Sequence, residues 1–101
     1  MTSKVIYKGA LRTEATHIRS GNTIITDAPT DNKGKGEAFS PTDLVATALA
    51  SCILTIMGIK ADGMNINIDG SSAEVKKIMG AGPRRIAQVN IIINIPLSAD
   101  E

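Results

Sequence analysis

The sequence predicts an α+β protein in which short N-terminal strands precede one long helix and a β-hairpin. Three observations support this prediction: residues before position 27 alternate in polarity, residues 44–59 form an uncharged apolar run, and alternation returns after residue 63. A chain of 101 residues has room for one domain and one hydrophobic core. Its apolar fraction of 43% is typical of a globular protein and not of a disordered one.

The first 27 residues are expected to form three short strands. Lys4–Lys8 is short and β-prone, and Gly9-Ala10 can turn the chain back. Leu11–Ile18 alternates between two faces, as a half-buried strand does. Ser20-Gly21-Asn22 is a turn signal before the β-branched segment Thr23–Thr26. Together these segments predict an antiparallel meander.

A polar, turn-rich segment at residues 27–36 predicts a flexible loop, and a long loop in a small domain is often functional. The strongest helix signal follows it. Ser40 is a good N-cap, a proline occupies the first helical position, and Asp43 completes a capping-box pattern. The helix is expected to run over Pro41–Ala61, with Gly63 just beyond its end.

The apolar residues of this helix leave no wide polar face, so we expect it to be buried nearly all round. Its uncharged run, Leu44–Ile59, is shorter than the ~20 residues of a membrane span. A chain of this size cannot easily surround such a helix, which predicts a homodimer. A second helix could pack closely on a stripe of small residues, namely Thr47, Ser51, Thr55 and Gly58.

The remaining segments predict two more strands. Residues 64–69 alternate in polarity, residues 70–72 introduce a bend, and the strand continues over residues 73–79. Residues 80–83 form a turn before a long strand over residues 84–95. The last four residues again resemble a capping box, so the chain is interpreted as ending within a further helix.

Composition excludes several classes of partner. The net charge of +1 is spread along the chain, and Tyr7 and Phe39 are the sole aromatic residues, so nucleic acid and anionic membrane are poor partners. One cysteine allows neither an internal disulfide nor a zinc cluster, and we expect no metal or cofactor. Residues 1–8 lack the apolar run of a secretory signal, which favours the cytoplasm.

The segment from Gly36 to Cys52, GEAFSPTDLVATALASC, resembles the signature of the OsmC/Ohr family (osmotically inducible protein C and organic hydroperoxide resistance protein). In that family a Gly-rich loop leads through a Ser-Pro or Asn-Pro step into a central helix that carries a reactive cysteine. The order of predicted elements also matches. The resemblance implies an OsmC-like fold over residues 1–101, incomplete because the final helix is missing, and an intertwined homodimer.

The resemblance also implies a peroxidase cycle. Cys52 would attack the O–O bond of an organic hydroperoxide, become a sulfenic acid, and be trapped by a second cysteine. The family's second cysteine lies on the helix after the last strand, beyond the residues present here. Family members are typically re-reduced by a dithiol such as a lipoyl protein. The implied role is defence against oxidative stress.

A thiol is nucleophilic only as the thiolate, and Cys52 lies too deep in its helix for the N-terminal dipole to stabilise that charge. A cation is therefore needed. Arg19 matches the family's N-terminal arginine best, and Arg12 is a less favoured alternative. Either Asp43 or Glu37 could hold the arginine in place.

One departure from the family pattern concerns this carboxylate. In the main branch a glutamate ten residues before the cysteine pairs with the arginine, whereas this chain has Thr42 there. The sequence is therefore closer to the OsmC-like branch. Two other functions stay open: a non-catalytic dimeric module that binds a small apolar ligand beside an inert Cys52, or an inactive family fragment without a resolving cysteine.

Overall fold

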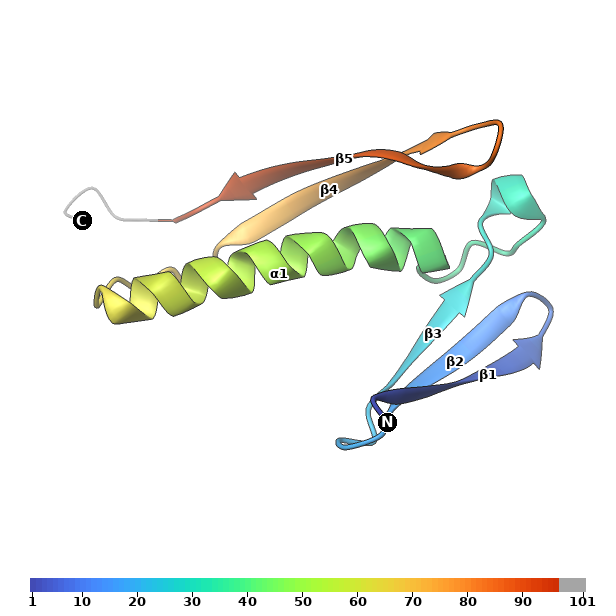
Figure 1. Ribbon diagram of the computed structural model, residues 1–101, viewed down its shortest axis with the longest axis horizontal. Coiled ribbons are helices and arrows are strands. Elements are labelled where there is room, and N and C mark those ends of the chain that lie inside the picture. The colour runs from blue at the N-terminus through green and yellow to red at the C-terminus, as the bar shows by residue number, and fades with distance from the viewer. Residues whose placement is uncertain (97–101) are drawn as a thin grey trace. The chain divides into compact units, whose positions relative to one another are not determined.

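A computed structural model describes residues 1–96 and confirms the predicted α+β class (Figure 1). The described residues form β1 (Ser3–Gly9), β2 (Arg12–His17), β3 (Thr23–Asp27), α1 (Pro41–Gly63), β4 (Ser72–Gly80) and β5 (Arg85–Asn94). The helix start expected at residues 98–101 lies outside the described residues. The chain divides into two compact units, one ending at Leu44 and one beginning at Val45.

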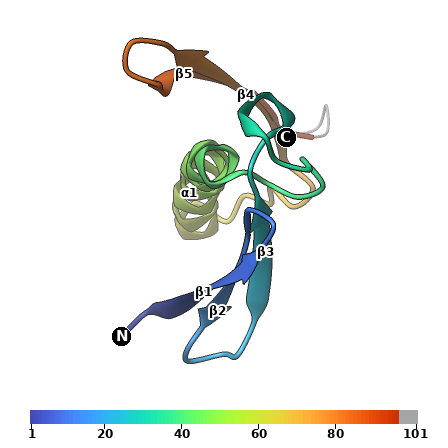
Figure 2. The ribbon, with the colours of Figure 1, turned by 90° about the vertical axis from the view of Figure 1, so that its right-hand side faces the viewer.

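The first unit contains the predicted meander, in which β1, β2 and β3 form an antiparallel sheet in that order (Figure 2). The turn between β1 and β2 is unusual because Ala10 and Leu11 both have positive φ, 53° and 63°. Residues with side chains seldom adopt this conformation. It is followed at once by Arg12, the first residue of β2.

The segment between β3 and α1, for which the sequence predicts a flexible loop, contains a series of hydrogen-bonded turns. A 3-10 turn covers Thr30–Asn32, and the backbone N–H groups of Asn32 and Gly34 both donate to the carbonyl of Pro29, each at 2.9 Å. Gly34 packs against the backbone of Ala28 so closely that an added Cβ would collide with its carbonyl group. The glycine is therefore required by the close approach of two backbone segments.

Local chemistry determines where α1 begins. The backbone N–H of Asp43 donates to Ser40 Oγ at 3.0 Å, and the N–H of Ser40 donates to Asp43 Oδ2 at 3.1 Å. This reciprocal pair is the predicted capping box, and it satisfies donors that a helix N-terminus otherwise leaves open. Ser40 is buried. The helix then continues two residues further than predicted, through Gly63.

The predicted strand at residues 64–69 is absent: this segment contains turns and irregular backbone. Asn65, and not Gly63, adopts the left-handed conformation after the helix, with φ of 57°. The side chain of Asn67 accepts a hydrogen bond from the backbone N–H of Asp69 at 2.7 Å. Such local side-chain bonds compete with a strand ladder, which explains why the alternating pattern does not produce a strand here.

The second unit ends in the predicted hairpin, in which β4 pairs with β5 in an antiparallel ladder. Val75 lies opposite Ile91 and Ala73 opposite Ile93, so apolar residues occupy paired positions on one face. The register shifts between Ile78 and Met79. The two strands match the predicted ranges to within a residue, and residues 81–84 form the turn between them.

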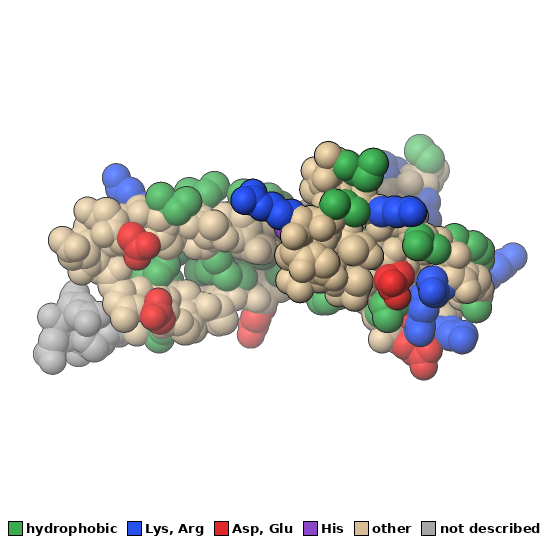
Figure 3. Space-filling model, turned by 90° about the horizontal axis from the view of Figure 1, so that it is seen from below, with side chains coloured by type: hydrophobic (Ala, Val, Ile, Leu, Met, Phe, Trp, Pro, Cys, Tyr) green, Lys and Arg blue, Asp and Glu red, His purple; other side chains and the backbone are tan. Residues whose placement is uncertain are grey.

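Within the single chain α1 is much less buried than its sequence predicts. Among described residues, its buried positions are Ala46, Ala50 and Ala61, whereas Ile59 is 69% exposed. The prediction of burial all round is therefore wrong for the isolated chain, because residues 1–96 cover only part of the helix. By length and composition alone, its 23 residues would suffice to cross a membrane. Apolar side chains also reach the surface in the space-filling view (Figure 3).

Candidate functional site

Three charged side chains of the first unit form one ion-pair cluster: Arg12, Asp27 and Glu37. Arg12 binds Asp27 through two parallel bonds, from Nε to Oδ1 at 2.7 Å and from Nη2 to Oδ2 at 2.8 Å. Nη2 also donates to Glu37 Oε1 at 3.3 Å. A paired, two-bond arrangement of this kind fixes the plane of a guanidinium as well as its position.

The register of the sheet brings the first two residues of this cluster together. Arg12 begins β2 and Asp27 ends β3, and they lie directly opposite each other in the antiparallel ladder. The backbone also closes around this pair, because the N–H of Ala28 donates to the carbonyl of Leu11 at 3.1 Å. The pair is therefore held by strand pairing and does not depend on chance contact between long side chains.

Asp27 also binds the segment that leads into α1. Its Oδ2 accepts the backbone N–H of Glu37 at 3.2 Å, and its own N–H donates to the carbonyl of Phe39 at 3.0 Å. One aspartate thus connects β2, β3 and the approach to the helix. Its side chain is 1% exposed, compared with 35% for Arg12 and 64% for Glu37.

This environment changes the pKa values of both partners. Hydrogen bonds from Arg12 are the largest cause of the lowered pKa of Asp27, and they outweigh the opposing effect of its burial. The hydrogen bond to Asp27 in turn raises the pKa of Arg12 further above its usual value. Asp27 is therefore a carboxylate and Arg12 a guanidinium throughout the physiological pH range.

We expect Asp27 to make stability depend on pH in the acid range. Because its folded pKa lies below the ordinary 3.8, its stabilising effect is complete above that value and is lost as pH falls through the folded pKa. Asp27→Asn should therefore be less stable than wild type at about pH 7, with the difference shrinking towards about pH 2.

The measurement is the urea midpoint of both proteins across this pH range. Asp62→Asn removes an exposed carboxylate from α1 and controls for the change in net charge. A difference between wild type and Asp27→Asn that stays constant with pH would contradict the expectation.

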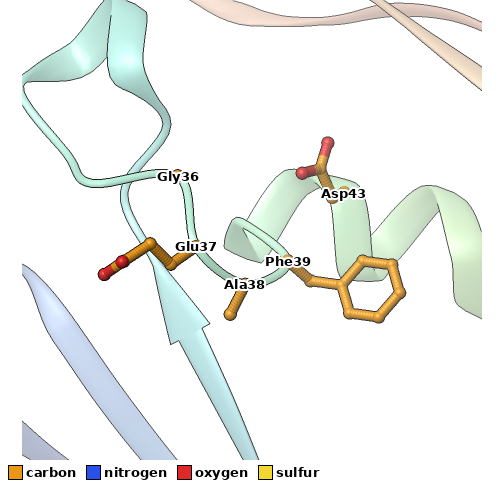
Figure 4. A pocket seen from close by; sticks show the side chains of 5 residues that line it. All are labelled: Gly36, Glu37, Ala38, Phe39 and Asp43. Atoms are coloured by element: carbon orange, nitrogen blue, oxygen red, sulfur yellow. The ribbon is translucent and has the colours of Figure 1, made fainter.

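The other carboxylate predicted to orient an arginine, Asp43, forms the capping box of α1. Gly36, Glu37, Ala38, Phe39 and Asp43 line a shallow hollow of about 500 Å³ (Figure 4). In this view the side chains of Glu37 and Asp43 extend in different directions. Glu37 contacts an arginine, Arg12, through its Oε1.

Arg19 lies in the exposed turn between β2 and β3. Within residues 1–96, no hydrogen bond or ion pair of its side chain is found. The turn is stabilised by its neighbours, since His17 Nδ1 and Ser20 Oγ are 2.6 Å apart and the N–H of Ser20 also donates to Nδ1. The arginine that the structure joins to a predicted carboxylate is thus Arg12, the less favoured of the two by sequence.

Cys52 belongs to the second unit, on the exposed face of α1, and its thiol is free. The predicted burial of the helix nearly all round would enclose this thiol, and that prediction is wrong for the single chain. Large apolar side chains share its face at alternating spacings of four and three residues, namely Val45, Leu49, Ile56 and Ile59. Such spacing places them in one line along a helix, with Cys52 at the centre. We call these five residues the apolar stripe.

Sequence reasoning missed Asp27, which it assigned to a flexible loop. A signal was present: if the turn at residues 20–22 joins two paired strands, the register places Arg12 opposite Asp27. Opposite charges at facing positions favour an ion pair. Among described residues there is no cluster of three His, Cys, Asp or Glu side chains that could hold a metal.

Comparison with known proteins gives two matches. Residues 34–101 match the family described as OsmC-like protein. The whole chain superposes on a crystal structure from Psychrobacter arcticus 273-4, described as a candidate osmotic stress induced and detoxification response protein. The TM-score is 0.95 and the sequence identity 61%, over 100% of this chain and 74% of that one. The search of curated proteins found no significant match. The resemblance carried by Gly36–Cys52 is therefore confirmed, and the chain belongs to the OsmC-like protein family.

Proposed function

We propose that this protein is a thiol-dependent peroxidase that reduces organic hydroperoxides through Cys52, in a response to oxidative stress. Family membership and the stress-related description of the Psychrobacter protein support the stress role. The observation that carries the chemistry is a free cysteine at the centre of an exposed apolar stripe. Apolar surroundings suit a hydroperoxide with a hydrocarbon group better than they suit hydrogen peroxide.

The proposed reaction begins with attack of the Cys52 thiolate on one oxygen of the O–O bond. An S–O bond forms and the O–O bond breaks; the sulfur is oxidised to a sulfenic acid, and the leaving alkoxide takes a proton to become an alcohol. A thiol then attacks the sulfenic acid, releasing water and forming a disulfide. That thiol comes from outside these 101 residues, and we propose that a dithiol such as a lipoyl protein completes the reduction.

The thiolate needs a positive charge, and we propose that Arg12 supplies it. The guanidinium stays protonated and its plane is held by Asp27. Glu37, which the sequence suggests as an orienting carboxylate, contacts this arginine. Arg19 remains the alternative, and Asp43 is assigned to capping the helix on which Cys52 lies.

The test is consumption of an organic hydroperoxide by the purified protein with a dithiol as reductant. We expect tert-butyl or fatty-acid hydroperoxide to be consumed faster than hydrogen peroxide, because the alkyl group can contact the apolar stripe. Equal rates with and without protein would contradict the proposed function.

A second candidate function is supported by the same stripe: binding of a small apolar ligand with Cys52 as an inert wall residue. The dependence of iodoacetamide alkylation on pH separates the two. A catalytic cysteine should still be alkylated rapidly at about pH 6, whereas an inert thiol should react appreciably only at alkaline pH.

We further propose that the protein is a soluble, cytoplasmic homodimer in which the apolar stripe is covered by a second copy. In this dimer α1 would be a core helix, although its length and composition alone would allow a membrane span. Alternating four- and three-residue spacing is the pattern by which helices pack on one another. Ile56 and Ile59 are 60% and 69% exposed in one chain, which a stable soluble protein would not leave uncovered.

Ile56→Glu should therefore convert a dimer to a monomer, or to insoluble protein, because it places a charge within the covered stripe. Sedimentation velocity of wild type and variant measures this directly. Lys60→Glu adds a negative charge to the same helix outside the stripe and should leave the dimer intact. Monomeric wild type, or a dimeric Ile56→Glu variant, would contradict the proposal.

A further inference from the structure

We propose that Asp27 is the positioning residue of this site: its carboxylate fixes the guanidinium of Arg12 so that one edge stays open to the reactants, whereas Glu37 is a replaceable outer partner. The inference rests on the proposed function and adds to it a residue from β3, in place of a carboxylate on the helix. Three observations in the first unit support it.

The first observation is the burial and bonding of Asp27. Its carboxylate is 1% exposed and accepts three hydrogen bonds, two from Arg12 and one from the backbone of Glu37. Both oxygens are therefore used, and the acceptor positions are defined by strand pairing and by the backbone. A carboxylate held in this way cannot turn to follow the arginine, so it determines where the guanidinium lies.

The second observation concerns the donors that Arg12 has left. A guanidinium carries five N–H groups, one on Nε and two on each terminal nitrogen. The bonds to Asp27 and Glu37 use Nε and Nη2. Among residues 1–96, the N–H groups of Nη1 have no partner, and the side chain is 35% exposed. The geometry therefore leaves one edge of a fixed cation without a partner among these residues and open to solvent.

The third observation is the difference between the two carboxylates. Glu37 contacts Arg12 through a single bond of 3.3 Å, and its side chain is 64% exposed. A surface contact of this type contributes little, and water can replace it. Its backbone N–H, which binds Asp27, is kept when the side chain is changed. The position of the guanidinium is therefore set by Asp27, and Glu37 adds an outer contact.

The test compares Asp27→Asn with Asp62→Asn in two assays: the rate of Cys52 oxidation by an organic hydroperoxide and the rate of Cys52 alkylation against pH. Asparagine keeps the shape but turns one acceptor into a donor that faces other donors. We expect Asp27→Asn to slow oxidation by roughly 10- to 100-fold, the size of effect that follows displacement of a reacting group. Its alkylation profile should move to higher pH. Asp62→Asn makes the same chemical change at an exposed carboxylate of α1 outside the cluster, and it should change either rate by less than about threefold.

Circular dichroism during thermal unfolding establishes the folded fraction of each variant at the assay temperature, and rates are divided by that fraction. A structural role alone would lower the folded fraction and leave the corrected rate and the alkylation profile unchanged. Wild-type corrected rates in Asp27→Asn, or equal losses in both variants, would overturn the inference.

Arg12→Lys provides an independent test that serves also if Asp27→Asn fails to fold. Lysine keeps the charge but cannot form the two parallel bonds to Asp27. We expect a loss of at least tenfold in the oxidation rate, and a loss of less than threefold would overturn the inference. The alkylation profile does not require peroxidase activity. If wild type consumes no peroxide, the proposed function fails, while the profiles still decide the role of Asp27.

Discussion

Cys52→Ser is expected to abolish hydroperoxide consumption completely. A serine hydroxyl is not ionised near neutral pH and cannot be oxidised by a peroxide, so neither the attack nor the sulfenic acid is possible. Because Cys52 is the sole cysteine, no other thiol of the sequence can replace it. The measurement is peroxide loss with a dithiol present, followed over time for wild type and variant.

Ser51→Ala is a suitable control for this experiment. It changes the neighbouring exposed residue of α1 from a hydroxyl to a methyl group, and alanine favours the helix. We expect wild-type consumption within about twofold. If Cys52→Ser and wild type consume peroxide equally slowly, the peroxidase assignment is wrong, and binding of an apolar ligand becomes the better account of the stripe.

Arg12→Ala should slow the oxidation of Cys52 by roughly 10²- to 10³-fold, the effect of removing one donor that stabilises charge in a transition state. The same substitution at Arg19 should change the rate by less than about twofold, because Arg19 lies in an exposed turn. Stopped-flow kinetics with an excess of hydroperoxide measures both rates. The folded fraction is checked in parallel, because Arg12→Ala leaves Asp27 buried without its partner.

The reverse result is equally informative. A large loss in Arg19→Ala with little change in Arg12→Ala would restore Arg19 as the partner of the thiolate, as the sequence resemblance suggests. In that case the cluster of Arg12, Asp27 and Glu37 would have a purely structural role in joining the sheet to the approach of α1.

Features that depend on neighbours in sequence could be predicted from the sequence. The capping box formed by Ser40 and Asp43 involves residues three apart, so its pattern is visible without any tertiary structure. The β4–β5 hairpin could also be predicted, because alternating polarity and a turn signal define both strands. The prediction failed at residues 64–69, where an alternating pattern competes with local hydrogen bonding. The side chain of Asn67 accepts a hydrogen bond from the backbone N–H of Asp69, which favours a turn over the expected strand.

The ion-pair cluster was harder to predict because it depends on which residues face each other across strands. Arg12 and Asp27 are fifteen residues apart in the sequence, and only the register of β2 with β3 makes them partners. Burial of α1 was overestimated for a related reason. Apolar residues show that a surface will be covered, but they do not show whether the cover comes from the same chain.

The central claim is that Cys52 is converted to a sulfenic acid by an organic hydroperoxide. The most direct measurement is mass spectrometry of the protein after brief exposure to one equivalent of hydroperoxide in the presence of dimedone. We predict a dimedone adduct on the peptide containing Cys52, absent without peroxide and reduced in Arg12→Ala at the same exposure time. An unmodified Cys52 after complete mixing, with hydroperoxide still present, would contradict this account.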